Sequence, residues 1–239
     1  MKIHRLKFFL IIFFFFASAT SLFAQQFEGE LIYDVRDSAG KITPLKMYGR
    51  GDHAKMSGVM FETQVDFYVT LDSLAMVFPN KKAGLMFGKD SAIAFFESEA
   101  REKDKGTDTL LKTCPTSKTK TISGFHCTCI EANYRSGKKR EFWVTSDVDS
   151  DLCMMFFRSS WLNFWVPSDG TAAFIRDLNK SGKLIIYSRT IENNILMNES
   201  TLMKVAKRPI ADDEIEVPST VNLMRVNPQF LKDASNKKK

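Results

Sequence analysis

The sequence predicts an α+β fold in which an antiparallel β-sheet is covered by helices. Segments with the two-residue apolar alternation of half-buried strands follow one another and are joined by short turns, which is typical of antiparallel pairing. The strand-helix-strand alternation of parallel sheets is missing, and so is any internal repeat. Residues 146–165 are apolar at helical spacing around nearly the whole circumference, so this segment suits a helix that covers the sheet.

Residues 1–24 have the layout of a secretory signal peptide. Basic residues precede the apolar run Phe8–Phe16, and Ala24 is a small residue at the expected cleavage point. The apolar run is far shorter than the roughly 20 residues that a membrane-spanning helix needs, which disfavours an anchor. No cysteine follows Ala24, so lipid attachment is not indicated. We expect a periplasmic or secreted protein that does not span a membrane.

A single domain is predicted over residues 25–226, followed by a disordered basic tail at 227–239. The formal net charge of +6 owes much to the leader and to Lys237–Lys239. A nucleic-acid partner is therefore not indicated.

The first part of this domain reads as a series of strands. Polar turns at Asp37–Gly40 and Gly51–Asp52 interrupt the alternation, and Pro79 interrupts it again. Strands are expected, in order, at residues 26–36, 41–50, 53–57, 62–72, 74–78 and 83–87.

A helix and a loop are expected next. Ile93, Phe96 and Ala100 recur at helical spacing, and charged residues follow them, which predicts a helix over 89–105 with an exposed end. Residues 106–120 are polar and rich in Thr and Lys, so they are predicted to form a loop around Cys114.

The clearest hairpin joins Phe125–Tyr134 to Arg140–Thr145. Gly137 can take the positive φ that a tight turn requires, and Ser123–Gly124 indicate a bend or bulge at the entry. Alternation places Cys127 on one face of the first strand, together with Cys129 and apart from His126.

After the apolar segment at 146–165, a short helix is expected at 169–180 and is ended by Gly182. A last strand pair turns at Asn193–Asn194, and one extended piece follows. These elements are expected at residues 184–191, 199–207 and 214–218.

Cysteines in an exported chain indicate disulfides, and the candidates are Cys114, Cys127, Cys129 and Cys153. Residues two apart on a regular strand lie about 7 Å apart with parallel side chains, which disfavours a bridge between Cys127 and Cys129. Free thiols are one alternative. A metal site is another, but Cys-x-Cys is not the usual zinc spacing, so no metal is predicted.

The sequence carries no catalytic motif. Beyond the leader it has only His53 and His126, and neither stands in a nucleophile, zinc-protease, calcium-loop or phosphate-loop pattern. Glu97 and Glu99 are paired carboxylates, but a solvated helix face explains them. We therefore predict a protein that is not an enzyme and has no cofactor.

The apolar helix has two interpretations. It can be simply the cover that the sheet needs, or it can form part of a ligand site, since Met adapts to varied shapes and pockets are largely apolar. The candidate ligand-binding residues are Met154, Met155, Phe156, Phe157, Trp161 and Trp165.

Four short motifs, taken in order, resemble a known family. They are Phe27–Tyr33, Met47–Tyr48 with Gly51–Asp52, Ile122–Cys127, and Phe142–Thr145. The chain resembles the exported Gram-negative proteins catalogued as domain of unknown function 4412. The resemblance implies a fold similar to the lipoprotein carriers LolA and LolB: a curved antiparallel sheet, an unclosed half-barrel, with helices packed in its concave face. It implies no catalytic residues.

Together these observations predict a periplasmic binding protein for an apolar or lipidated ligand, a LolA-like carrier or sensor. The alternative is an envelope protein-protein interaction module with a solid core and no ligand cavity.

Four Asp-Ser or Asp-Thr pairs followed by an apolar residue resemble the O-glycosylation acceptor of some Gram-negative periplasms. The hydroxyl residues are Ser38, Ser73, Ser91 and Thr109. Ordinary turn chemistry explains the same pairs.

Overall fold

The computed structural model describes residues 28–60, 62–88, 91–92, 108–148 and 170–227. They form one twelve-stranded sheet with the strand order β12-β6-β5-β4-β3-β2-β1-β11-β10-β9-β8-β7. The strands are β1 (Glu28–Asp37), β2 (Ile42–Arg50), β3 (His53–Met60), β4 (Thr63–Val69), β5 (Ser73–Phe78), β6 (Ala83–Gly88), β7 (Leu110–Ile122), β8 (Phe125–Tyr134), β9 (Lys139–Thr145), β10 (Leu184–Glu192), β11 (Ile195–Lys207) and β12 (Asn222–Arg225).

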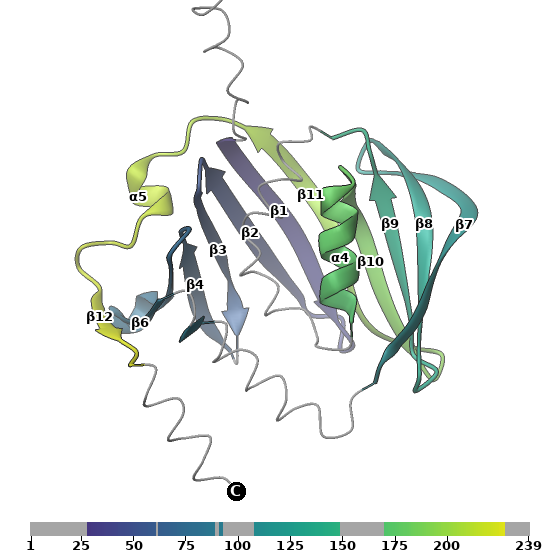
Figure 1. Cartoon of the computed structure of the whole chain (residues 1–239), viewed down its shortest axis with the longest axis horizontal. Coiled ribbons are helices and arrows are strands. Elements are labelled where there is room, and N and C mark those ends of the chain that lie inside the picture. The colour runs from purple at the N-terminus through teal and green to yellow at the C-terminus, as the bar shows by residue number, and fades with distance from the viewer. Residues whose placement is uncertain (1–27, 61, 89–90, 93–107, 149–169, 228–239) are drawn as a thin grey trace, which may run out of the picture.

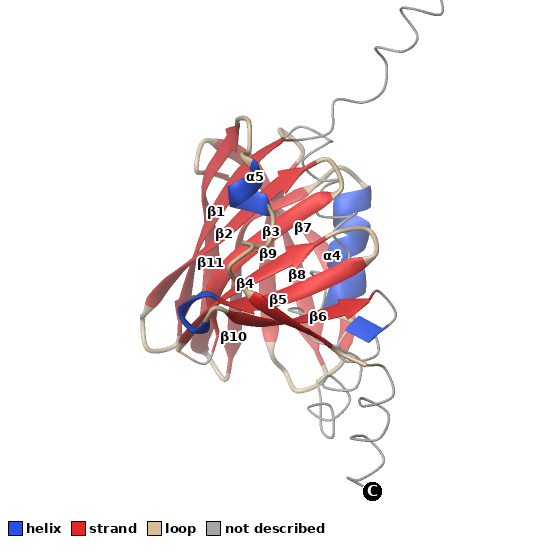
Figure 2. Cartoon of the chain, turned by 90° about the vertical axis from the view of Figure 1, so that its left-hand side faces the viewer, coloured by secondary structure: helices blue, strands red, loops and turns tan. Residues whose placement is uncertain are grey.

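The sheet is large, almost entirely antiparallel and unclosed, as the sequence predicted in outline. Each strand pairs antiparallel with its neighbours except β12, which runs parallel to β6. Figure 1 shows the sheet curving from β6 on one side to β7 on the other, and Figure 2 shows the same curvature from the side. The two ends of the sheet do not pair, so β12 and β7 are its edges.

Few helices accompany the sheet in the part of the chain that is described. They are η2 (Pro79–Lys81), α4 (Thr171–Lys180) and α5 (Asp212–Ile215). α4 is the helix predicted at 169–180, and Gly182, at a φ of 73°, follows its end. The helices predicted at 89–105 and 146–165 lie outside the described residues, apart from 91–92 and 146–148.

One row of apolar residues crosses half of the sheet. The strand registers place Leu31 beside Met47, and the row continues through β3, β4, β5 and β6. Its members are Leu31, Met47, Met56, Phe67, Met76 and Leu85. We call the face that carries this row the inner face and the opposite one the outer face. Because strand side chains alternate, the same register puts the polar neighbours of these residues on the outer face.

Tight turns lie where the sequence predicted them. Gly137 has a φ of 88°, and Asn193 and Asn194 have φ of 51° and 62°. Asn is the residue that adopts this region most readily after Gly. Ser123–Gly124, where a bend or bulge was expected, form the two-residue turn between β7 and β8, with φ of 51° and 84°.

The predicted loop at 106–120 is wrong, because most of it belongs to β7. Within the described sheet this strand pairs with β8 alone, and it is largely exposed on both faces. A strand in that position needs no apolar alternation, since its hydrogen bonds to β8 hold it in place. Its threonines suit a strand, because β-branched residues favour extended backbone.

The predicted extended piece at 214–218 is wrong at its start, although the backbone is extended at Glu216. Asp212–Ile215 form the single turn α5, and the Glu214 side chain accepts a hydrogen bond from the amide of Ala211 at 3.1 Å. No local pattern indicated β12 or its parallel pairing with β6. β11 begins at Ile195, four residues before the predicted start.

Phe67 provides a test of the inner-face row. Its side chain is 1% exposed, so Phe67→Ala removes a large buried group and leaves a cavity. We expect the free energy of unfolding to fall by about 3–5 kcal/mol in urea denaturation. Val59→Ala, at a side chain that is 45% exposed, is the control and is expected to cost about 0.5 kcal/mol or less. Equal losses in the two variants would contradict the assignment of Phe67 to the core.

Candidate binding surfaces

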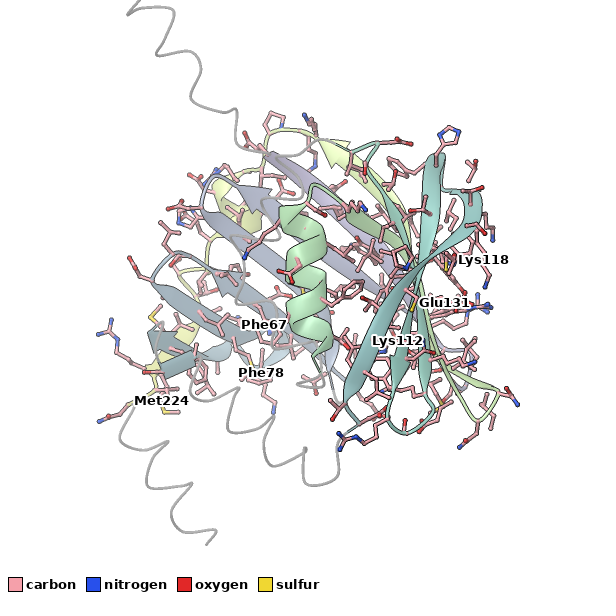
Figure 3. All side chains as sticks on the ribbon, turned by 45° about the vertical axis from the view of Figure 1, so that its right-hand side comes forward. Phe67, Phe78, Lys112, Lys118, Glu131 and Met224 are labelled. Atoms are coloured by element: carbon pink, nitrogen blue, oxygen red, sulfur yellow. The ribbon has the colours of Figure 1, made fainter. Side chains whose placement is uncertain are left out.

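Along the row, the inner face is buried from β1 to β4 and becomes accessible toward β12. Leu31 and Phe67 are 0% and 1% exposed, whereas Met76 and Leu85 are only partly buried. Met224 of β12 lies beside Leu85 and is 65% exposed. Figure 3 shows Phe67 near the middle of the sheet, with Phe78 and Met224 toward that end. The described part of the inner face is therefore buried in its centre, and the row itself becomes accessible toward the β6–β12 end.

α4 packs against β8 and β9 on this same side of the sheet. The Phe174 ring lies 5.3 Å from that of Phe142, and the hydroxyls of Thr171 and Tyr134 are 2.5 Å apart. Leu178 joins the buried cluster of this region. Phe142 of β9 lies directly opposite Ser188 of β10, and the hydroxyl of Ser188 lies 2.8 Å from that of Ser200 on β11. These three side chains therefore lie on the same face of the sheet.

The outer face carries a strap formed by the end of the described chain. Residues 208–226 cross from β1 to β6, where β12 completes the sheet. Val217, Val221 and Leu223 pack on a buried apolar cluster of β4 and β5. A Cβ on Gly84 would lie 2.6 Å from the Met76 carbonyl oxygen and 2.9 Å from Leu223, so only glycine allows the strap to approach this closely.

A charged network holds the strap at the β1 side. Arg208 contacts Glu214 at 2.6 Å and Glu30 at 3.1 Å, and Lys204 pairs with Glu30 as well. The Arg208 guanidinium and the Ala211 amide lower the pKa of Glu214 to about 2. Arg50 adds a hydrogen bond to the carbonyl oxygen of Ile210 at 2.8 Å.

A ladder of polar side chains crosses the outer face of β7–β11. Arg189 binds Glu141 with two hydrogen bonds, at 2.8 and 2.9 Å. Glu131 lies directly opposite Glu141, and Lys118 compensates this like-charge pair at 2.7 Å from Glu131. Burial and a hydrogen bond to Glu199 raise the pKa of Tyr187 to about 12. Each charge in the ladder has a partner, which is typical of a structural arrangement.

The cysteines that the structure describes do not form the expected disulfide. Cys114, Cys127 and Cys129 are free thiols, and Cys153 lies outside the described residues. Burial raises the pKa of Cys127 and of Cys129, which disfavours the reactive thiolate.

The histidines do not activate these thiols. His126 is exposed, and its ring nitrogen lies 3.3 Å from Asp147; that of His53 lies 3.5 Å from Asp52. Within the described ranges, no group of three or more His, Cys, Asp or Glu side chains could hold a metal ion.

The other predicted site residues divide into two groups. The candidate ligand-binding residues of the apolar helix lie outside the described residues; they are Met154, Met155, Phe156, Phe157, Trp161 and Trp165. Among the glycosylation candidates, Ser38 and Thr109 are exposed, Ser73 is half-buried and Ser91 is 7% exposed. Asp37 accepts hydrogen bonds from the amides of Ala39 and Lys41, both at 2.9 Å, which is the turn chemistry that also explains its motif.

Three β-bulges place apolar side chains in solvent. Shifts in register leave Leu111 of β7 and Met197 and Met203 of β11 without a directly opposed residue. These residues are 60%, 37% and 56% exposed. Sequence reasoning missed them, since an apolar residue in a strand is expected to face the core. A bulge reverses that expectation because the extra residue re-aims its side chain.

Comparisons with known proteins gave structural likenesses only. No protein-family model matches the chain, and no curated protein matches its sequence. An uncharacterised conserved protein from Thermus thermophilus has a TM-score of 0.47 at 4% identity, covering 87% of this chain and 99% of that one. A structure of MucB has a TM-score of 0.42 at 7% identity, covering 83% of this chain and 60% of that one. A structure of the MucA/MucB complex of Pseudomonas aeruginosa has a TM-score of 0.45 at 8% identity, covering 84% of this chain and 59% of that one. This chain thus spans less than two thirds of the MucB chains.

In the part of the chain that the structure covers, no helix has the length and apolar character needed to cross a bilayer.

The Arg208–Glu214 pair predicts a pH dependence of stability. The pKa of Glu214 is lowered in the folded protein, so its contribution is complete above the ordinary pKa of 4.5 and is lost as the pH falls toward about 2. We expect Glu214→Gln to lower the urea midpoint at pH 7, and the difference from the wild type to shrink between pH values of about 4.5 and 2.

Asp213→Asn is the control, because this neighbouring carboxylate is exposed. It is expected to leave the midpoint nearly unchanged at both ends of the range. A difference between Glu214→Gln and the wild type that stays constant with pH would show that the ion pair is not its origin.

Proposed function

We propose that this chain is an exported, non-enzymatic protein of the cell envelope that binds another polypeptide on its surface. The burial of the inner face is the observation that carries the proposal. Leu31, Phe67 and Leu74 are at most 1% exposed, so the centre of the sheet offers no open apolar surface to a ligand. The leader at 1–24 supports export, and the resemblance to the exported family named above agrees with it.

The exposed apolar side chains support a protein partner. Leu111, Met197 and Met203 reach solvent through bulges, and bulges often re-aim side chains at functional sites. Ile195 at the tip of the β10–β11 hairpin is 62% exposed. Apolar groups presented from fixed backbone positions are the anchors that protein interfaces use.

A second candidate is the binding of an apolar or lipidated ligand. The inner-face row favours it at one end, where Met76 and Leu85 are partly buried and Met224 is exposed. Methionine adapts to varied ligands. In that function the predicted residues of the apolar helix would contribute the other wall of the site.

Native mass spectrometry separates the two candidates. We expect the chain purified from the periplasm to have the mass of the processed polypeptide alone, because the centre of the inner face is already buried. Solvent extraction of the same sample should release no lipid in a stoichiometric amount. A lipid bound at one copy per chain would overturn the proposal in favour of the second candidate.

Site-specific photocrosslinking tests the protein partner directly. A photoreactive residue at Met197 or Leu111 is expected to capture the same envelope protein in cells, identified by mass spectrometry and by reciprocal crosslinking. The same probe at Val59, which is also exposed, is the control and should capture little. Equal capture at all positions, or none at Met197 and Leu111, would contradict a partner at the bulges.

A further inference from the structure

β7 is an edge strand that the protein leaves open. It is last in the strand order, and among the described residues it pairs only with β8. Eight of its 13 residues are exposed and the other five are half-buried. The opposite end of the sheet differs, because β12 from the strap covers the edge of β6. Figures 1 and 3 show β7 at the far side of the sheet from β12.

The turn at Ser123–Gly124 fixes which backbone groups of β7 are free. Ile122 and Phe125 flank this two-residue turn, so they form a hydrogen-bonded pair. Antiparallel pairs alternate, and the next pair, Thr121 and His126, is therefore not hydrogen-bonded. The His126 amide donates to Asp147 instead, at 3.1 Å. The N–H and C=O groups of Thr121 thus point away from β8, toward the open edge.

Thr119 pairs with Thr128, two residues along from Thr121, so by the same alternation its N–H and C=O groups also point toward the open edge. A bulge next to Pro115 ends this regular segment, and the Thr116 hydroxyl fixes the bulge by donating to the Cys129 carbonyl oxygen at 3.1 Å. Residues 119–122 therefore present a short run of regular strand with outward-facing backbone groups.

The charges of β7 are all positive. Lys112, Lys118 and Lys120 are its only charged residues, and all three are exposed. The register places Lys112 opposite Asn133 and Lys120 opposite Cys127, on the face of the sheet that carries Glu131. Figure 3 shows Lys112, Lys118 and Glu131 along this strand pair. Among the described residues, Lys118 has a carboxylate partner, whereas Lys112 and Lys120 have none.

These charges decide which strand can be added. A second copy of β7 would bring lysines opposite lysines, and like charges across a strand pair are destabilising. A strand with acidic residues on alternate positions would meet the same lysines favourably. We infer that the open edge of β7 binds an extended, acidic segment of a partner protein by strand addition. The inference rests on the proposed function and adds the surface and the chemistry of the partner.

A labelled seven-residue peptide that alternates Glu and Val is the probe, with binding measured by fluorescence anisotropy. The full mature chain is expected to bind it and to bind the corresponding Lys and Val peptide at least about tenfold more weakly. The Glu peptide methylated at every backbone amide keeps its charge but cannot pair as a strand, and it should not bind.

Variants of the protein test the same two features, the positive charge of β7 and its outward-facing backbone groups. Lys112→Glu combined with Lys120→Glu is expected to weaken binding at least about tenfold. Lys41→Glu with Lys46→Glu makes the same change in net charge at exposed lysines away from β7 and should have little effect. Thr121→Pro removes an N–H group that faces the open edge, so we expect it to keep the pairing of β7 with β8 but to abolish peptide binding. Thr121→Val retains this N–H group and is expected to keep both the strand pairing and the binding.

Equal binding of the Glu and Lys peptides, or of the methylated and unmethylated ones, would overturn the inference even if a variant failed to fold. The proposed function would survive that result if photocrosslinking at Met197 still captured a partner. Failure of the crosslink at Met197 together with success of the peptide would instead locate the interface at β7 alone.

Discussion

The row of apolar side chains across the inner face is the interaction on which the rest of the structure depends. Each strand from β1 to β6 contributes a directly opposed residue, from Leu31 through Phe67 to Leu85. Fully burying a side chain of this kind, as at Leu31 and Phe67, is worth about 1.5–3 kcal/mol. A register slip of one residue on any strand would turn its apolar residues to the outer face, so this row also sets the register.

The outer face follows from the same register. Because alternate residues point away from the row, Glu30, Tyr48 and Lys55 align on the other side. There Lys55 pairs with Asp66 at 3.3 Å, and Glu30 receives Lys204 and Arg208. The strap binds to this charged surface, and its strand β12 then pairs with the edge of β6.

The two edges are therefore treated differently. The β6 edge is covered by the chain itself, with Leu223 against Gly84. The β7 edge carries lysines, a bulge and Pro115, features that keep copies of a protein from pairing through their edges. Such features exclude an identical strand without excluding an oppositely charged one, which is how a protective edge can also be selective.

The sequence by itself determined the elements whose signals are local: the alternation of β1 and β8, the turns at Gly137 and Asn193–Asn194, and the end of α4 before Gly182. It also excluded familiar catalytic motifs, because those are short patterns. Only the tertiary structure decided the elements that depend on a partner strand. β7 is a strand because β8 supplies its hydrogen bonds, and β12 exists because Arg208 and Leu223 dock the strap on distant strands. The bulges at Leu111, Met197 and Met203 likewise arise from register between strands, a quantity that no single segment of sequence contains.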